Sequence, residues 1–282
     1  MKKLMYLPWI VVLVVLLTGA KPSSSVALVV CAPGYPGNTE QAQPTMDAFA
    51  ENVESLTGWK KGRLTATYFE TAAAGIEAMK AENAAVALVP LSLFAQQADA
   101  LELEPRLLAV PNTGPVEAWT LVAPQGTAAE PRSLDGWEVA SRAGYAPEFV
   151  RGVVFEGWDL PETANIEFTT RIVSRLRKAA TGENVAVLLD GEQSAALGSL
   201  SFAKDLEVVF TSKPLPAFVA CTIGDRLDEK DAAALFEALL ELDDEKGGAD
   251  VLEQIRLVRF ETLDDVRIDQ IESVRERAAN RN

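Results

Sequence analysis

The sequence contains no histidine, and this absence excludes several kinds of chemistry at once. Without an imidazole there is no histidine general base, no serine–histidine or cysteine–histidine nucleophile pair, and no histidine-ligated metal. Cysteine is nearly absent as well, since Cys31 and Cys221 are too few for a structural zinc cluster. Each lies in an apolar run typical of a strand, so we expect two buried free thiols rather than a disulfide. We expect no cofactor, no bound metal and no catalytic residue.

Positive charge is also scarce. The 26 lysine and arginine residues face 41 aspartate and glutamate residues, which gives a net charge of −15. Such a surface repels nucleic acids and anionic lipid surfaces, so neither is an expected partner. The length of 282 residues suffices for two ordinary domains, and 48% hydrophobic residues argue against extensive disorder.

The N-terminus predicts export. A pair of lysines precedes an apolar run over residues 4–20, and a polar, serine-rich flank follows. Ala20 stands where a bacterial lipoprotein box carries its lipidated cysteine, so no diacylglycerol anchor is expected. We expect cleavage after Ala20, with a mature chain that begins at Lys21. Retention of residues 1–25 as a single N-terminal anchor is the alternative. Both place the folded body in the periplasm, outside the cytoplasmic membrane.

Two stretches roughly a hundred residues apart read almost the same. Residues 82–88 (Glu-Asn-Ala-Ala-Val-Ala-Leu) and 183–189 (Glu-Asn-Val-Ala-Val-Leu-Leu) agree at five of seven positions. Each follows a helical segment and precedes another helix. The repeated unit predicts two lobes built on one plan, although a chance match in a chain rich in alanine, valine and leucine is the alternative.

Short apolar runs alternate with helical patterns along the chain. Strands are expected at residues 26–32, 64–69, 85–89, 107–110, 138–141, 166–168, 185–189 and 206–210. Helices are expected at residues 46–58, 71–81, 92–100, 147–155, 170–180 and from 193, and beyond Cys221 only helices are expected, at 230–242, 249–255 and 264–279. This alternation predicts an α/β fold with a mainly parallel sheet in each lobe, flanked by helices. For the charged final segment, packing across lobe 1 is favoured over docking of a partner.

Two extended segments with prolines, residues 114–124 and 213–219, suit strands that cross between the lobes. Residues 26–115 then form the first part of lobe 1, residues 116–215 an inserted lobe 2, and residues 216–282 the rest of lobe 1. We expect the crossing strands to act as a hinge, and a ligand to bind in the cleft between the lobes.

With these features in place, the chain resembles the type II periplasmic solute-binding proteins, and more narrowly their phosphate-, phosphite- and phosphonate-binding branch. The segments that carry the resemblance are residues 32–37, 85–93, 133–140, 189–196 and 211–216. The resemblance covers roughly residues 26–262. It implies a two-lobed fold of the Venus-flytrap kind and a monomeric protein that captures a small solute for an ABC-type permease.

One turn departs from that branch. Phosphonate-binding members resemble one another in a turn rich in serine and threonine that leads into Gly-Tyr, and here it reads Ser141-Arg142-Ala143-Gly144-Tyr145. Ala143 replaces a hydroxyl, which disfavours a simple phosphonate. Arg142 offers charge-assisted hydrogen bonds, but a solvated surface charge is its favoured role. We therefore expect a larger, less charged solute. A carrier of lipid or another hydrophobic ligand is one alternative, and an enzyme on the same fold is another.

The expected cleft collects aromatic and polar side chains from strand ends and crossings. Several of them have structural alternatives: a helix start for Glu70 and Thr71, an N-cap for Ser92, and a capped first turn for Asp190. The candidate ligand-binding residues are Tyr35, Tyr68, Glu70, Thr71, Leu91, Ser92, Asn112, Trp119, Ser141, Arg142, Tyr145 and Asp190.

Overall fold

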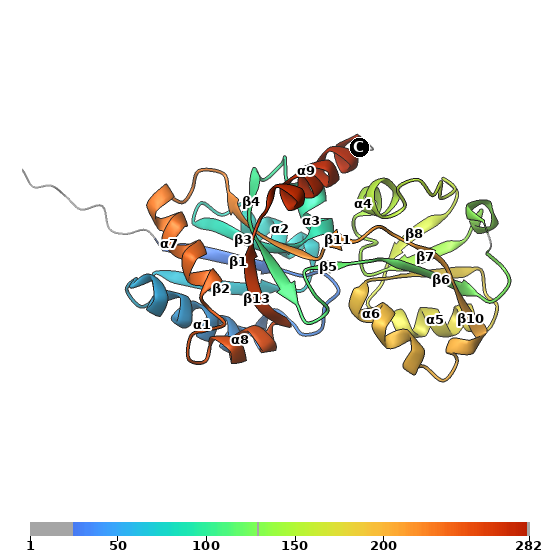
Figure 1. The fold of residues 1–282 in the computed structure, drawn as a ribbon, viewed down its shortest axis with the longest axis horizontal. Coiled ribbons are helices and arrows are strands. Elements are labelled where there is room, and N and C mark those ends of the chain that lie inside the picture. The colour runs from blue at the N-terminus through green and yellow to red at the C-terminus, as the bar shows by residue number, and fades with distance from the viewer. Residues whose placement is uncertain (1–24, 129, 281–282) are drawn as a thin grey trace, which may run out of the picture.

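The structure, a computed structural model, describes residues 25–128 and 130–280. The chain forms two lobes that lie side by side along the long axis of the molecule, each a sheet flanked by helices (Figure 1). The predicted two-lobed α/β fold is confirmed. The predicted export signal falls almost entirely outside the described residues. Within the described residues, no helix combines the length and the apolar character needed to cross a bilayer.

Lobe 1 is built on a six-stranded sheet with the order β13-β4-β12-β3-β1-β2. Its strands are β1 (Val26–Cys31), β2 (Leu64–Phe69), β3 (Ala84–Pro90), β4 (Leu103–Pro111), β12 (Phe218–Ile223) and β13 (Leu257–Thr262). Its helices are α1 (Thr39–Thr57), α2 (Ala72–Met79), α3 (Leu91–Gln97), α7 (Glu229–Leu240), α8 (Gly248–Gln254) and α9 (Asp265–Ala279). Strands from both ends of the chain therefore share one sheet.

Lobe 2 is built on a five-stranded sheet with the order β10-β6-β9-β7-β8. Its strands are β6 (Thr120–Pro124), β7 (Glu138–Ser141), β8 (Asn165–Phe168), β9 (Val185–Leu189) and β10 (Leu206–Thr211). Its helical segments are η1 (Pro131–Leu134), α4 (Pro147–Phe149), the π-helical turn η2 (Val150–Val154), α5 (Ile172–Ala180), α6 (Gly191–Ala196), η3 (Leu197–Ser199) and η4 (Ala203–Asp205).

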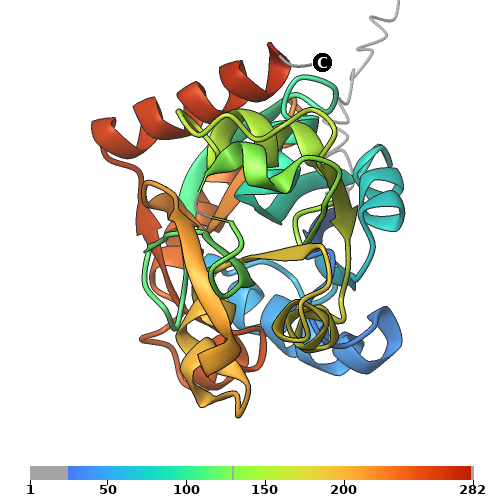
Figure 2. The ribbon, with the colours of Figure 1, turned by 90° about the vertical axis from the view of Figure 1, so that its right-hand side faces the viewer.

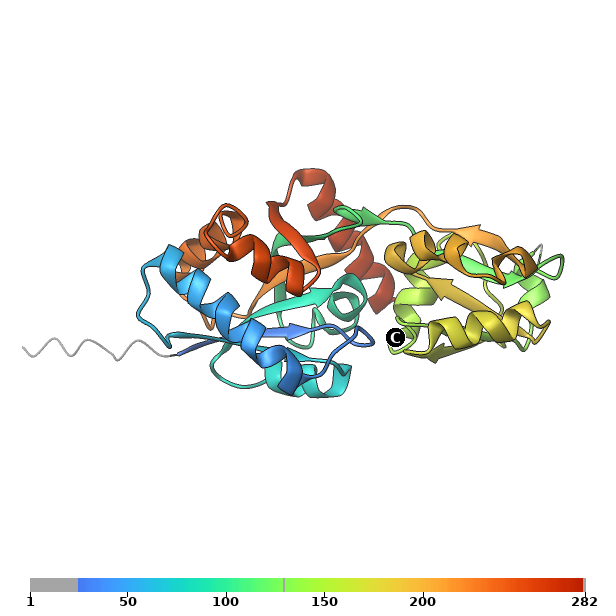
Figure 3. The same cartoon turned by 90° about the horizontal axis from the view of Figure 1, so that it is seen from below.

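Two short strands connect the lobes. β5 (Val116–Glu117) pairs antiparallel with β11 (Leu215–Pro216), so the outgoing and returning segments of the chain run side by side between the lobes (Figure 3). The domain boundaries predicted at residues 115/116 and 215/216 fall at this pair of strands. These boundaries and the hinge role of the strands stay predictions.

Both sheets are mixed, which corrects the expectation of mainly parallel sheets. β1 is parallel to β2 and β3, and β7 is parallel to β8 and β9. The strands that enter each lobe from a crossing, β6 in lobe 2 and β12 in lobe 1, pair antiparallel with both of their neighbours. A strand that enters from the other lobe is antiparallel to its neighbours in the sheet. The hydrophobic pattern of a strand does not reveal whether it is parallel or antiparallel to its neighbours.

The sequence analysis did not predict β13, because only helices were expected beyond Cys221. β13 pairs with β4 at the edge of the lobe 1 sheet. Only Leu257 and Phe260 of its six residues are buried, and a register shift between Leu257 and Arg259 breaks the two-residue period. An edge strand with two inward side chains and a bulge carries little of the alternation by which strands are recognised.

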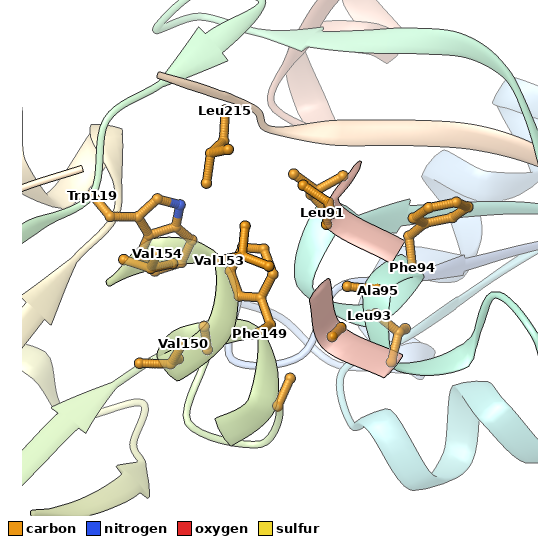
Figure 4. Packing of buried hydrophobic residues seen from close by; sticks show 14 of the residues in the cluster. Leu91, Leu93, Phe94, Ala95, Trp119, Phe149, Val150, Val153, Val154 and Leu215 are labelled. Atoms are coloured by element: carbon orange, nitrogen blue, oxygen red, sulfur yellow. The ribbon is translucent and has the colours of Figure 1, made fainter. Parts of the chain in front are cut away.

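A continuous hydrophobic core joins the two lobes. Leu91 and Leu93 of α3 in lobe 1 belong to the same buried cluster as Phe149 and Val153 of the α4–η2 segment in lobe 2 (Figure 4). Trp119, on the lobe 2 side of the crossing, packs edge-on against Phe149 with ring centroids 5.9 Å apart. The lobes are therefore held against each other by apolar packing as well as by the chain crossings.

Helix α9 adds to this contact, because it packs against α3 of lobe 1 and against α4 and η2 of lobe 2. It lies across the top of the molecule when the view runs along the long axis (Figure 2). Ile271 and Val274 are buried in the shared core. The sequence reading expected α9 to pack across lobe 1, and its contacts extend to both lobes.

We predict that Ile271→Ala lowers the free energy of unfolding by about 2–5 kcal/mol, because it opens a cavity in a fully buried part of the shared core. Ile268→Ala is the matched control, since the same substitution on the same helix removes a side chain that is 36% exposed. Its effect should stay below about 1 kcal/mol. Urea unfolding followed by circular dichroism measures both, and equal effects would contradict the assigned packing of α9.

Candidate functional site

Side chains from both lobes meet beside the crossing strands, in a region that we call the junction. Tyr35, in the turn between β1 and α1, and Ser92, in the first turn of α3, belong to lobe 1. Arg142 and Tyr145 follow β7 in lobe 2. The hydroxyls of Ser92 and Tyr145 are 2.7 Å apart, and the guanidinium of Arg142 lies 4.0 Å from the centroid of the Tyr35 ring. These contacts leave a space of only about 10 Å³.

Arg142 is largely shielded from solvent in the junction, which corrects the expectation of a solvated surface charge. Its side chain is 12% exposed, and its Nη1 lies 3.0 Å from a carboxylate oxygen of Asp190. The backbone makes room for it: Gly34 has a φ of +82°, and a Cβ at that position would lie 2.7 Å from the Cγ of Arg142. Burial, the largest single effect, opposes the charge on Arg142, but Asp190, Tyr35 and Glu192 together outweigh it and raise the pKa of the guanidinium.

Asp190 has two roles. It is the N-cap of α6, where its Oδ1 accepts a hydrogen bond from the backbone N–H of Gln193 at 2.9 Å and Gln193 completes a capping box. The expected helix capping is confirmed. The other carboxylate oxygen of Asp190 faces Arg142, a contact that sequence reasoning did not foresee. The charge of Arg142 is thus neutralised within the protein.

Glu117, on β5, is a site residue that the sequence reading missed. It lines both the junction and a larger cavity whose lining comes mainly from lobe 1, and its Oε2 accepts a hydrogen bond from the backbone N–H of Gly191 at 2.9 Å. Burial, followed by the negative charge of Asp190, raises the pKa of Glu117 to about 7. The signal in the sequence was an acidic residue in an otherwise apolar crossing segment.

The larger cavity, which we call the lobe 1 cavity, has a volume of about 480 Å³. This lies within the range of about 300–1,000 Å³ that is usual for small-molecule sites. Its apolar floor comes from α1 and the sheet, and consists of Val30, Met46, Tyr68, Leu88, Phe218 and Leu257. Its rim is polar, and includes Gln41, Thr45, Asn112, Thr113, Gln254 and Arg256. Sequence reasoning identified only Tyr68 and Asn112 of these, and β13 had not been recognised as a strand.

Tyr35, like Glu117, lines both the junction and the lobe 1 cavity. Its ring packs edge-on against Phe218, with centroids 5.4 Å apart, while Arg142 lies over its face. The hydroxyl of Tyr68 donates to the backbone carbonyls of Ala32 and Tyr35, both at 3.4 Å. Tyr68 thus supports the turn that positions Tyr35.

Three of the predicted residues line neither space and bond instead to the protein. Glu70 accepts hydrogen bonds from the backbone N–H and the hydroxyl of Thr39, at 3.1 and 2.9 Å, at the start of α1. Thr71 is the N-cap of α2, as its structural alternative predicted. Ser141 is fully buried and donates to the carbonyl of Leu188 at 3.0 Å.

The remaining predicted residues have defined places. Leu91 and Trp119 line the junction and contribute apolar surface. The expected N-cap role of Ser92 is wrong, because α3 begins after Pro90 without a side-chain cap and the hydroxyl of Ser92 faces Tyr145 instead. Cys31 and Cys221 are buried free thiols, as expected. Among residues 25–128 and 130–280, no group of three or more cysteine and carboxylate side chains is placed to hold a metal ion.

No protein-family model matches the sequence, and no curated protein matches it. Solved structures do match the fold. A Xanthomonas citri protein with bound chloride has a TM-score of 0.71 at 12% identity, over 92% of this chain and 98% of that one. The methylphosphonate complex of PhnD1 from Prochlorococcus marinus has a TM-score of 0.62 at 12% identity, over 93% and 100%.

The binding-protein component of an ABC phosphonate transporter from Pseudomonas aeruginosa has a TM-score of 0.61 at 15% identity, over 91% of this chain and 88% of its own. These structures cover nearly the whole of the described chain, including both lobes. The chain therefore has the two-lobed fold of the type II periplasmic binding proteins.

We predict that Glu117→Gln changes the free energy of unfolding, relative to the unsubstituted chain, in a pH-dependent way. The difference should shift in favour of the variant as the pH rises from 5 to 8. The Glu117 carboxyl has a pKa of about 7 in the folded state against 4.5 as its ordinary value. As pH rises through this window, the unfolded chain loses its proton first, so ionisation of Glu117 destabilises the fold. Above pH 7 the cost is on the order of 1–3 kcal/mol, and glutamine removes it.

Urea unfolding at several pH values measures this difference in stability. Glu253→Gln, which removes an exposed glutamate, corrects for the general effect of deleting one negative charge. A stability difference between Glu117→Gln and the unsubstituted protein that stays constant from pH 5 to pH 8 would show that Glu117 is ionised throughout and would contradict the raised pKa.

Proposed function

We propose that this protein is a periplasmic solute-binding protein that captures a small molecule and presents it to an ABC-type permease. The observation that carries the proposal is the meeting of Tyr35 and Ser92 from lobe 1 with Arg142 and Tyr145 from lobe 2, beside the strands that connect the lobes. Solute-binding proteins of this fold bind between their lobes. The export signal expected over residues 1–25 supports the periplasmic location, and the crossing strands β5 and β11 are the proposed hinge.

We propose binding rather than catalysis, and the state of the nucleophiles supports this. Burial, followed by the charge of Glu70, raises the pKa of the Cys31 thiol to about 12, and burial raises that of Cys221 as well. Both thiols are therefore protonated at neutral pH and are poor nucleophiles. Burial also raises the pKa values of Tyr35 and Tyr145, so neither phenol serves as a base near neutral pH. The sequence offers no histidine to activate a hydroxyl.

The proposal predicts that protein purified from its host carries a non-covalent solute. Native mass spectrometry should show a bound mass, and extraction with organic solvent should remove it and return the mass of the polypeptide. The recovered solute should be unchanged after a long incubation with fresh protein, because a binding protein does not consume its ligand. A bare polypeptide mass under native conditions would contradict solute binding, and chemical conversion of the solute would favour an enzyme.

We further predict that phosphate, methylphosphonate and 2-aminoethylphosphonate bind weakly or not at all. Ala143 has no hydroxyl to offer, and one missing hydrogen bond to a charged group costs roughly 1.5–3 kcal/mol. Arg142 is already paired with Asp190, and Glu117 and Glu192 add negative charge beside it. Isothermal titration calorimetry at moderate salt measures the affinities.

Asp190→Asn is the informative variant for this prediction, because asparagine keeps the helix cap but frees the guanidinium of Arg142. It should strengthen phosphate binding relative to the unsubstituted protein. Binding of any of the three anions at micromolar or lower concentration, abolished by Arg142→Ala, would instead restore an ordinary phosphonate ligand.

A further inference from the structure

We infer that the lobe 1 cavity is a binding site for a small apolar amine, with Glu117 as the counter-ion of its ammonium group. The inference rests on the proposed solute-binding function and names the chemical class of the solute. It also moves the principal site from the junction to the lobe 1 cavity, which Tyr35 lines together with Glu117 of the crossing and Glu192 of lobe 2.

The volumes of the two spaces decide between them. The junction holds about 10 Å³, which is room for about one water molecule, whereas the lobe 1 cavity holds about 480 Å³. The junction is closed by direct contacts between the lobes, among them the pair Ser92–Tyr145. The cavity has an exposed rim that includes Gln41 and Gln254, so a solute can enter it from the solvent.

The floor of the cavity selects an apolar body. Met46, Leu88 and Phe218 reach it from α1, β3 and β12, and the ring of Tyr68 completes it. Met46 and Leu88 are almost completely shielded from solvent by the rest of the protein. An alkyl or aromatic group that fills this space removes its own apolar surface from water and gains the hydrophobic contribution of that burial.

The charges at the cavity select a cation. Its lining contains three charged side chains, Glu117, Glu192 and Arg256. Arg256 and Glu192 pair with each other at 2.6 Å, which leaves one negative charge on the wall. That charge is on Glu117, whose one hydrogen bond comes from the backbone N–H of Gly191 and which makes no ion pair within the described part of the chain.

The wider surroundings of Glu117 point the same way. Burial, followed by Asp190 and Glu192, raises the pKa of Glu117, and Arg142, which opposes them, is itself held by Asp190. A partly buried carboxylate without a charged partner is unfavourable, and an ammonium group within hydrogen-bond distance relieves this cost. A ligand carboxylate would instead meet Glu117 and would have to displace Glu192 from Arg256.

The test uses three probes that share one apolar body and differ in charge: 4-phenylbutylamine, 4-phenylbutan-1-ol and 4-phenylbutanoate. Calorimetry on the purified protein at pH 8 should rank the amine first, the alcohol second and the carboxylate last. Glu117→Gln should weaken binding of the amine by about tenfold or more and change that of the alcohol by less than about twofold. Amine binding should also weaken from pH 8 to pH 6, as Glu117 takes up its proton, while alcohol binding stays level.

A second variant tests the location. Ala42→Trp places a large ring on the wall that α1 contributes to the cavity and should abolish binding of the amine and the alcohol. Ala73→Trp, at an exposed position on α2 outside the cavity, is the matched control and should leave both unchanged. Circular dichroism and the unfolding midpoint confirm that each variant folds.

Four outcomes would overturn the inference. If the affinity for 4-phenylbutanoate equals that for 4-phenylbutylamine, Arg256 rather than Glu117 would be the residue that recognises the charge of the ligand. Equal affinity for all three probes, unchanged by Glu117→Gln, would show that Glu117 does not act as a counter-ion. Binding that survives Ala42→Trp would show that the probes bind outside the cavity. No binding of any probe would show that the cavity is not a site for this class of solute. In the last case, a solute recovered by native mass spectrometry and retained by Ala42→Trp would leave the proposed function intact and refute only the inference.

Discussion

An apolar contact between α3 and the α4–η2 segment holds the two lobes together, and the side chains of the junction depend on it. Leu91 and Leu93 belong to the same buried cluster as Phe149 and Val153, and α9 packs against both sides of the contact. Because the lobes meet through this core, Tyr145 comes within hydrogen-bond distance of Ser92. The ion pairs of α9 with both lobes, Arg275 with Asp99 and Arg277 with Glu156, lie at the exposed margin of the contact and add little by comparison.

The charges at the junction are balanced because the two lobes lie close together there. Arg142 is buried beside Tyr35 and needs a partner for its charge, and Asp190 supplies it from the first residue before α6. Burying either charge alone would be costly, so the pair is a single unit in this fold. An anionic solute would have to replace Asp190 as the partner of Arg142 while Glu117 and Glu192 remain close by. The acidic net charge of the chain acts in the same direction at longer range.

The sequence reveals the lobes and the crossings because both depend on local patterns: short apolar strands, helix periodicity, and prolines in extended segments. It does not reveal strand direction, the bulged edge strand β13, or the burial of Arg142. That burial depends on Gly34, a residue more than a hundred positions away, whose missing side chain admits the arginine. Glu117 and the α8–β13 wall of the cavity were missed for the same reason, since their placement arises from contacts between distant segments. Thr71 and Asp190, by contrast, are helix caps, and local sequence was enough to recognise that role.

The shared core also bears on how a solute is exchanged. Separating the lobes would expose apolar surface of Leu91 and Phe149 to water, at about 25 cal/mol for each Å². A solute bound in the junction would have to offset that exposure each time it entered or left. A solute in the lobe 1 cavity passes only the exposed rim, so its exchange does not require the α3 contact to open. Movement about β5 and β11 would still affect such a site, because Glu117 is part of β5 and Glu192 reaches the cavity from lobe 2. The position of one lobe relative to the other would then set the charge that the solute meets.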